Sequence, residues 1–264
     1  MKTPENFSHA WTRHPIVYED EVLIAIDKPE GVLSHPNARG ARGRHAFEGP
    51  YDPASRTFET PMGRLWLLHR LDQDSSGLLL GAKKGDAAQA LRAAFEEGKV
   101  QKTYLALVRG HVKPLHGRWK DHLAKQMGQG QVRSRSLPGR PPNAESAYEV
   151  HLFPPGARWM PLLRKELSLL EIQLITGRTH QIRVQAAARQ HPLAGDRIYG
   201  NFEWNRRLRR EMGLDRLFLH AWSLKFRHPA TSHGLSLKAP LPAELAVSLE
   251  KLGVSPEKIV QKKS

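Results

Sequence analysis

The chain has 264 residues, of which 39% are hydrophobic and 25% are charged, with 21 Gly and 19 Pro. This composition is that of a globular protein, and it excludes collagen-like, coiled-coil and wholly disordered chains. Cysteine is absent, which excludes disulfide scaffolds, thiolate metal sites and cysteine nucleophiles. The net charge of +15 and the pI near 10.3 favour a polyanionic partner, and nucleic acid is the partner that we expect.

The positive charge is unevenly distributed along the chain. Residues 1–68 contain 8 Lys or Arg and 9 Asp or Glu, so the whole excess lies in 69–264. Residues 101–165 alone contain 12 basic and 3 acidic side chains. Basic blocks of this kind favour nucleic-acid binding over a merely solubilising surface. The sequence shows no signal peptide and no apolar run of membrane-spanning length, so we expect a cytoplasmic protein with no membrane partner.

The first hundred residues predict short strands, a long loop and one helix. Residues 1–15 are expected to form a loose leader, followed by strands at 16–18 and 22–26 and a turn at 27–31. Residues 35–63 show no periodicity and are expected to be loop. A strand at 78–80 precedes a helix at 86–98, for which Asp86 is the expected N-cap and Gly98 the expected C-cap.

The rest of the chain predicts further strands and two helices. Residues 113–143 hold seven basic residues and one Asp among scattered Gly and Pro, which predicts a mobile basic hairpin or arm. Strands are expected at 101–108, 144–153, 167–175 and 217–226, helices at 179–190 (with Thr179 as N-cap) and 203–212, and a frayed tail at 255–264. Because the strands do not alternate with helices as βαβ units would, the sequence predicts an α+β fold with a mainly antiparallel sheet. No repeat or composition break marks a second domain, so we expect one domain over 16–254.

The segment HRLDQDSSG at 69–77 places two acids, a His and an Arg between apolar runs. The simpler interpretation is a turn satisfied by Asp and Ser, with Gly77 at a positive φ. The functional interpretation is that Asp72 is a carboxylate kept ionised and oriented by an arginine, as a nucleophile or base requires. Spacing alone leaves both open.

Two further segments carry chemistry. Tyr104, on the expected strand at 101–108, is either a core residue or a ring that stacks on a nucleobase. The segment TGRTHQIRV at 176–184 brings a Gly turn, two arginines and a His to a helix N-terminus, where N–H groups and the helix dipole favour phosphate. A capped helix with solvated arginines is an equally good interpretation. The other His residues lack ligand-like spacing, so we expect no metal site.

These segments resemble the motifs of the RluA-type family of RNA pseudouridine synthases. The resemblance is carried, in the family's order, by residues 27–29, 69–78, 102–108, 176–184, 191–192, 195–196, 219–221 and 228–229. It spans about residues 16–245. Two positions depart from the family pattern: Ser75 stands where Thr is usual, and Gln185 where His is usual. The basic segment 113–143 matches poorly.

The resemblance implies a single α+β catalytic domain, built on a long mixed, mainly antiparallel sheet with a central cleft flanked by helices. It implies an isomerase that converts a specific uridine of ribosomal or transfer RNA into pseudouridine. No cofactor and no metal are expected. RNA would bind the chain's own basic surface, with 113–143 as a candidate arm, and a monomer is expected because the sequence has no heptads.

The resemblance also implies roles for three catalytic residues. Asp72 would act at the sugar, either by attacking C1′ or by removing a sugar proton. Arg183 would pair with Asp72 and keep it charged, and Tyr104 would stack on the uracil.

The remaining residues of the resemblance would contact RNA. The backbone at Val184 would read the uracil edge. Arg70, Arg178 and His180 would contact phosphate or fill the space that the flipped base leaves. Asp74 is expected to be a turn residue.

Two alternatives come from other functional classes. One is a non-catalytic RNA-binding or ribosome-assembly protein on the same fold, against which the presence of Asp72, Tyr104 and Arg183 argues. The other is a metal-dependent phosphodiesterase that uses His69, Asp72 and Asp74. Two acids in a Ser- and Gly-containing turn make a poor divalent-cation site, so we place this alternative last.

Overall fold

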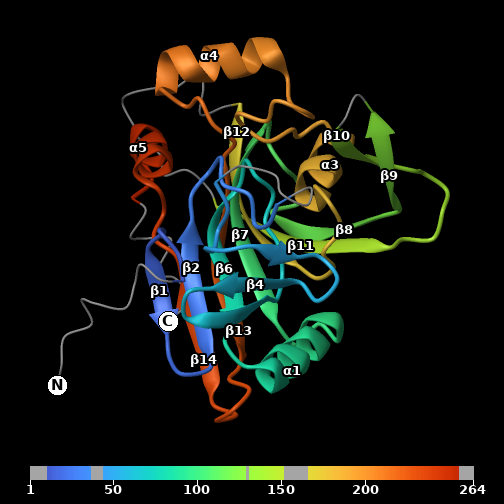
Figure 1. The fold of residues 1–264 in the computed structure, drawn as a ribbon. Coiled ribbons are helices and arrows are strands. Elements are labelled where there is room, and N and C mark those ends of the chain that lie inside the picture. The colour runs from blue at the N-terminus through green and yellow to red at the C-terminus, as the bar shows by residue number, and fades with distance from the viewer. Residues whose placement is uncertain (1–10, 37–43, 129–130, 152–165, 256–264) are drawn as a thin grey trace. The chain divides into compact units, whose positions relative to one another are not determined.

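The computed structural model describes residues 11–36, 44–128, 131–151 and 166–255 (Figure 1). The chain divides into two compact units, which we describe separately. Unit 1 comprises Met1–Gln101 and Ala221–Pro240, and unit 2 comprises Lys102–His220 and Leu241–Ser264. The strand pairs β2–β6, β5–β6, β13–β14, β7–β12, β11–β12 and β8–β11 run antiparallel, and the predicted α+β class with a mainly antiparallel sheet is confirmed. The single domain over 16–254 and the central cleft stay predictions.

Unit 1 is a sheet with one helix. Its strands are β1 (Ile16–Glu19), β2 (Leu23–Lys28), β3 (Tyr51–Asp52), β4 (Thr57–Thr60), β5 (Gly63–Leu67), β6 (Ser76–Ala82), β14 (Gly234–Lys238) and most of β13 (Leu219–Arg227). Strands β3, β4, β5, β6 and β13 are neighbours in that order, β2 pairs with both β1 and β6, and β14 pairs with β13. The strand and turn predictions for 16–31 and 78–80 are confirmed in substance.

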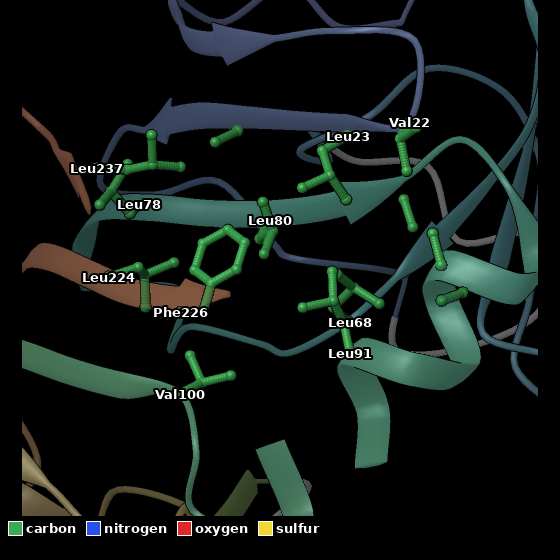
Figure 2. Packing of buried hydrophobic residues seen from close by; sticks show 14 of the residues in the cluster. Val22, Leu23, Leu68, Leu78, Leu80, Leu91, Val100, Leu224, Phe226 and Leu237 are labelled. Carbon is green, nitrogen blue, oxygen red and sulfur yellow. The ribbon is translucent and has the colours of Figure 1, made fainter. Parts of the chain in front are cut away.

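Strand β6 is buried along its whole length and forms the centre of unit 1. Alternate residues Leu78 and Leu80 point into one hydrophobic cluster, as the period of two in a strand requires. Figure 2 shows Leu224 and Phe226 of β13 packed against them, with Leu91 of α1 (Gly85–Glu96) at the far end. This core fixes the two strands that flank the 69–77 segment.

Gly77 lies at the start of β6 with φ +112°, as predicted. A Cβ atom there would lie 2.3 Å from the carbonyl oxygen of Ala221 on β13. Only glycine allows this close approach of two backbones, so Gly77 sets how tightly β6 packs on β13.

Three expectations for unit 1 were wrong. Residues 35–63 are not all loop, because β3, β4 and the start of β5 lie within them. The caps of α1 are Lys84 and Glu97 rather than Asp86 and Gly98, and Asp86 lies inside the first turn, where its carboxylate accepts from the N–H of Ala87. Residues 11–15 are not loose: Trp11 is buried and the Thr12 hydroxyl donates to the carbonyl of Ala46 at 2.6 Å. Residues 1–10 of the expected leader lie outside the described residues.

Unit 2 contains a second run of strands and three described helices. The strands β7 (Gln101–Arg109), β12 (Leu167–Leu174), β11 (Ala144–His151) and β8 (His116–Asp121) are neighbours in that order. Strands β9 (Leu123–Gly128) and β10 (Gln131–Ser136) pair as a separate hairpin, and the helices are α3 (Gln181–Ala188), α4 (Phe202–Met212) and α5 (Ala243–Lys251). Strand β10 lies beside α3 (Figure 1).

Most elements expected for unit 2 are present. The strands predicted at 101–108, 144–153 and 167–175 correspond to β7, β11 and β12, and the helix at 203–212 to α4. Within 113–143, β9 and β10 pair as a hairpin and β8 pairs with β11, and the mobile basic hairpin or arm stays a prediction. The N-cap of α3 is His180 rather than Thr179. The strand β14 and the helix α5 were not predicted, and 256–264 of the expected tail lie outside the described residues. No helix in the described ranges is long and apolar enough to cross a membrane.

Candidate functional site

The candidate residues are divided between the two units. Unit 1 holds Asp72 and Arg70, and unit 2 holds Tyr104, Arg178, His180, Arg183 and Val184. Each group has its own local support, which the following paragraphs build from the backbone outward.

The main chain on both sides of Asp72 is fixed by hydrogen bonds from residues 28–34. On one side, the Ser34 hydroxyl accepts from the N–H of Leu71 and donates to its carbonyl, both at 2.9 Å. On the other side, the carbonyl of Gln73 accepts from the N–H of Gly31 at 2.9 Å. The Asp72 side chain is half-buried. Asp72 is therefore positioned through its neighbours' backbone, in the coil between β5 and β6.

Lys28 is the centre of this support. Its side chain is fully buried, and its Nζ donates to the carbonyls of Pro29 and Val32, both at 2.8 Å, and of Gln73 at 3.4 Å. An ammonium group taken out of water needs such partners. The sequence marked 27–29 only as a block of the resemblance, so the tie from Lys28 to the residue after Asp72 was missed.

The turn after Asp72 matches the simpler prediction for its neighbours. The N–H of Ser75 donates to the carbonyl of Asp72 at 3.1 Å, with Asp74 inside the turn. Ser75 is buried, and its hydroxyl has no hydrogen-bond partner among the described residues. His69 accepts from the N–H of Leu80 at 3.1 Å. The described part of the chain contains no group of three His, Asp or Glu side chains placed to hold a metal ion, so the phosphodiesterase alternative lacks its ligand set there.

Arg183 is held on α3 by a buried ion pair within unit 2. Its side chain is 1% exposed, and its Nε and Nη2 donate to the two carboxylate oxygens of Asp196, both at 2.8 Å. Asp196 also accepts from the N–H groups of Ile198 and Tyr199. Burial by itself would raise the pKa of Asp196, but the hydrogen bond and charge of Arg183 outweigh it and lower the pKa. The pair is ionised and its geometry is bidentate.

Tyr199 connects Arg183 to the β9–β10 hairpin. The Arg183 guanidinium carbon lies 5.5 Å from the centre of the Tyr199 ring, a cation–π contact. The Tyr199 hydroxyl accepts from the N–H of Ser134 on β10 at 2.8 Å and hydrogen-bonds Nδ1 of His180 at 2.9 Å. His180 has a left-handed backbone with φ 54°. Tyr199 was not predicted as a site residue, because its position depends on the turn after α3.

The other predicted residues of unit 2 are placed as follows. Tyr104 is 8% exposed on β7, opposite Ile172 of β12. Val184 is buried in a small cluster with Leu123, and its N–H already donates to the carbonyl of His180 at 2.9 Å. Arg178 is exposed, and its Nε donates to the carbonyl of Asn143 at 3.1 Å.

Gln185, which departs from the family pattern, is part of a buried polar network. It is fully buried; its Oε1 accepts from the Ser146 hydroxyl at 2.8 Å, and its Nε2 donates to Asp121 at 2.8 Å. Nε2 also lies 3.1 Å from the carbonyl of Trp119. The departure therefore falls on a group that joins α3 to β8 and β11, and its hydrogen bonds are satisfied by protein.

The chain is similar to known proteins over much of its length. The family model described as RNA pseudouridylate synthase matches residues 22–188. The ribosomal large subunit pseudouridine synthase C of Haemophilus ducreyi is 36% identical over 246 residues, which cover 90% of this chain and 68% of that protein. The protein of the same name from Escherichia coli strain K12 is 37% identical over 244 residues, with 90% and 69% covered.

Solved structures give the same fold. Human RNA Pseudouridylate Synthase Domain Containing 4 matches with a TM-score of 0.64 at 23% identity, over 90% of this chain and 93% of that chain. Human RNA Pseudouridylate Synthase Domain Containing 1 matches with a TM-score of 0.61 at 22% identity, over 89% and 87%. At this identity the likeness concerns the fold.

Proposed function

Because this chain belongs to the RNA pseudouridylate synthase family, we propose that it isomerises a specific uridine of ribosomal RNA with Asp72 as its catalytic carboxylate. In this reaction the C1′–N1 bond breaks, the uracil turns, and C1′ bonds to C5, which then loses its proton while N1 gains one. A base inside a helix must first be flipped out, at a cost of a few kcal/mol.

The observation that carries the proposal is the fixed backbone around Asp72. Hydrogen bonds to Leu71 and Gln73 define the position of the residue between them, while its carboxylate is half-buried. A nucleophile or base needs this combination of a fixed main chain and a side chain that substrate can reach. Asp72 would attack C1′ or remove a sugar proton.

Arg183 is proposed as the positive charge that keeps Asp72 ionised. A guanidinium has five N–H donors, and Asp196 accepts from two of those of Arg183. The two hydrogen bonds to Asp196 support this role, because they hold the Arg183 side chain in one rotamer.

Tyr104, which is 8% exposed on β7, is proposed to stack on the uracil. The backbone at Val184, whose N–H donates to the carbonyl of His180, is proposed to read the uracil edge. Arg70 and Arg178 are exposed and are proposed to contact RNA phosphates. His180 is proposed to contact phosphate or to fill the space that the flipped base leaves.

The choice of ribosomal RNA is supported by the names of the relatives, of which this chain spans about two thirds. Transfer RNA is the other outcome of the test. We propose that the protein works in the cytoplasm as a monomer, and that it uses neither a cofactor nor a metal.

The test maps pseudouridine in cells with and without this gene. Carbodiimide treatment followed by primer extension should show one stop in large-subunit ribosomal RNA that disappears in the knockout. Wild-type protein and Asp74→Asn should restore the stop, and Asp72→Asn should not. If Asp72→Asn restores the stop, Asp72 is not the catalytic carboxylate. If the stop that the knockout loses is in transfer RNA, the substrate is transfer RNA rather than ribosomal RNA.

A further inference from the structure

Four aromatic rings form a continuous series in unit 1. Phe47 and Phe58 lie with ring centres 5.7 Å apart, Phe58 and Tyr51 are 4.8 Å apart, and Tyr51 and His35 are stacked at 5.0 Å with 15° between their planes. The two phenylalanines are buried, whereas Tyr51 and His35 are only half-buried. The series therefore begins in the core and ends at the surface with a flat stacked pair.

Three arginines act electrostatically on Tyr51, in the outer part of this series. The charges of Arg56, Arg92 and Arg70 all act on Tyr51 and oppose the effect of burial, which is larger and raises its pKa. Arg92 is anchored by Nη2, which donates to the carbonyl of Ser55 at 2.9 Å. Arg56 and Arg70 are exposed, and neither forms an ion pair with any residue that the structure describes.

Arg56 occupies a backbone position that favours glycine. Its φ is 57°, in the left-handed region, which costs a residue with a Cβ about 1–2 kcal/mol. Its carbonyl accepts from the N–H of Leu67 at 2.9 Å, which places the 52–56 turn beside the end of β5, three residues before Arg70. The turn therefore presents the exposed Arg56 side chain on the same side of the chain as the end of β5.

We propose that His35, Tyr51, Arg56 and Arg70 form a binding site for an unpaired nucleotide of the RNA substrate, next to the target uridine. The base would stack on His35 and Tyr51, and the flanking phosphates would contact Arg56 and Arg70, since base–aromatic stacking and bidentate Arg–phosphate contacts are the usual means of holding single-stranded RNA. The site rests on the proposed function for its substrate, because Arg70 lies two residues before Asp72.

This site explains why the 35–63 segment has its structure. The register pairs Tyr51 with Phe58 and Phe58 with Leu65, so the short β3 and β4 strands serve to carry the rings. A segment needed only to connect β2 to β5 would not require the ring series.

The first test measures binding of a fluorescein-labelled, single-stranded 12-nucleotide oligouridylate by anisotropy. His35→Ala should weaken binding by roughly 5- to 150-fold, the range found for loss of one base-stacking ring. His35→Phe keeps a flat ring and should restore most of the affinity, which separates stacking from any loss of fold. Unchanged binding by His35→Ala overturns the stacking site.

The second test uses Arg56→Gly against Arg64→Ala, which removes the same charge from an exposed arginine paired with Glu59 in unit 1. Arg56→Gly should weaken binding and reduce the salt dependence by about 0.7 of a logarithmic unit per unit of log salt, the value for one phosphate contact to a single strand. Its melting temperature should hold or rise, because glycine relieves the strained φ. Equal binding and equal salt slopes for the two variants overturn the phosphate site.

The failure of this site can be distinguished from failure of the proposed function. If wild-type protein forms pseudouridine and the His35 and Arg56 variants bind and react normally, the nucleotide site is wrong and the function stands. If wild-type protein forms no pseudouridine but His35→Ala loses oligouridylate binding, the site stands and the proposed function is wrong.

Discussion

Asp72 and Arg183 are held by opposite means. Around Asp72, unit 1 fixes the main chain: Ser34 and Lys28 bond to the backbone of the residues before and after it, and the carboxylate itself is half-buried. Around Arg183, unit 2 fixes the side chain, which is 1% exposed and bonded twice to Asp196. A group that must reach a substrate atom is best positioned through its main chain, which leaves the side chain accessible. A group that supplies charge is best positioned by hydrogen bonds to its charged atoms.

The largest expected effect comes from removing the carboxylate that holds the Arg183 side chain. Asp196→Ala leaves a buried guanidinium without its partner, and loss of one member of a buried pair costs about 3–5 kcal/mol of the free energy of unfolding. Urea denaturation measures this cost. The matched control is Asp215→Ala, because Asp215 is 54% exposed and pairs at the surface with Arg209 at 3.5 Å. Its loss should cost at most about 1 kcal/mol. Similar midpoints for the two variants would show that Asp196 does not stabilise unit 2.

A smaller effect should come from the backbone support in unit 1. Ser34→Ala removes two hydrogen bonds to Leu71 and leaves buried backbone groups unpaired, at a cost of about 1–3 kcal/mol. Because the main chain next to Asp72 is then held less firmly, kcat should fall while KM stays near the wild-type value. Ser248→Ala is the matched control, since Ser248 is equally buried and its hydroxyl donates to the carbonyl of Glu244 in α5. A kcat loss shared by both variants would reflect stability alone.

These two supports differ in how far the sequence predicted them. The 69–77 and 176–184 segments, the strands that carry them and the positive φ of Gly77 were predicted because local pattern and the resemblance both report on short stretches of chain. Ser34 and Asp196 were not predicted as supports, because each acts across a turn whose path depends on tertiary packing. The strands β3 and β4 were missed because two and four residues are too few to show a period.

The ring and the hydroxyl of Tyr199 have different partners, so two substitutions can separate their roles. Tyr199→Phe keeps the ring beside Arg183 but loses the bonds to Ser134 and His180, at a cost of about 1 kcal/mol. We expect it to raise KM, because the basic β9–β10 hairpin is loosened, and to leave kcat nearly unchanged. Tyr199→Leu also removes the ring and should lower kcat. Equal kcat values for the two variants would rule out a role for the ring in positioning Arg183.

The smallest expected effect is the pH dependence of stability, to which one carboxylate in each unit contributes. The pKa of Asp196 is lowered because Arg183 and backbone N–H groups outweigh its burial, and that of Asp20 because Tyr18 and its other hydrogen bonds outweigh its burial. A carboxylate whose pKa is lower in the folded state stabilises the protein above its unfolded pKa, near 3.9, and this stabilisation is lost as pH falls through the folded pKa. The free energy of unfolding should therefore decrease below about pH 4.

The measurement is the urea midpoint from pH 6 to pH 2.5. The midpoint should fall less steeply with pH for Asp196→Asn than for wild type. Asp20→Asn should also flatten the profile, but less than Asp196→Asn does, because Asp20 is more exposed and its charge is better solvated. Parallel profiles for wild type and both variants would show that the two carboxylates have the same pKa in the folded and unfolded chain.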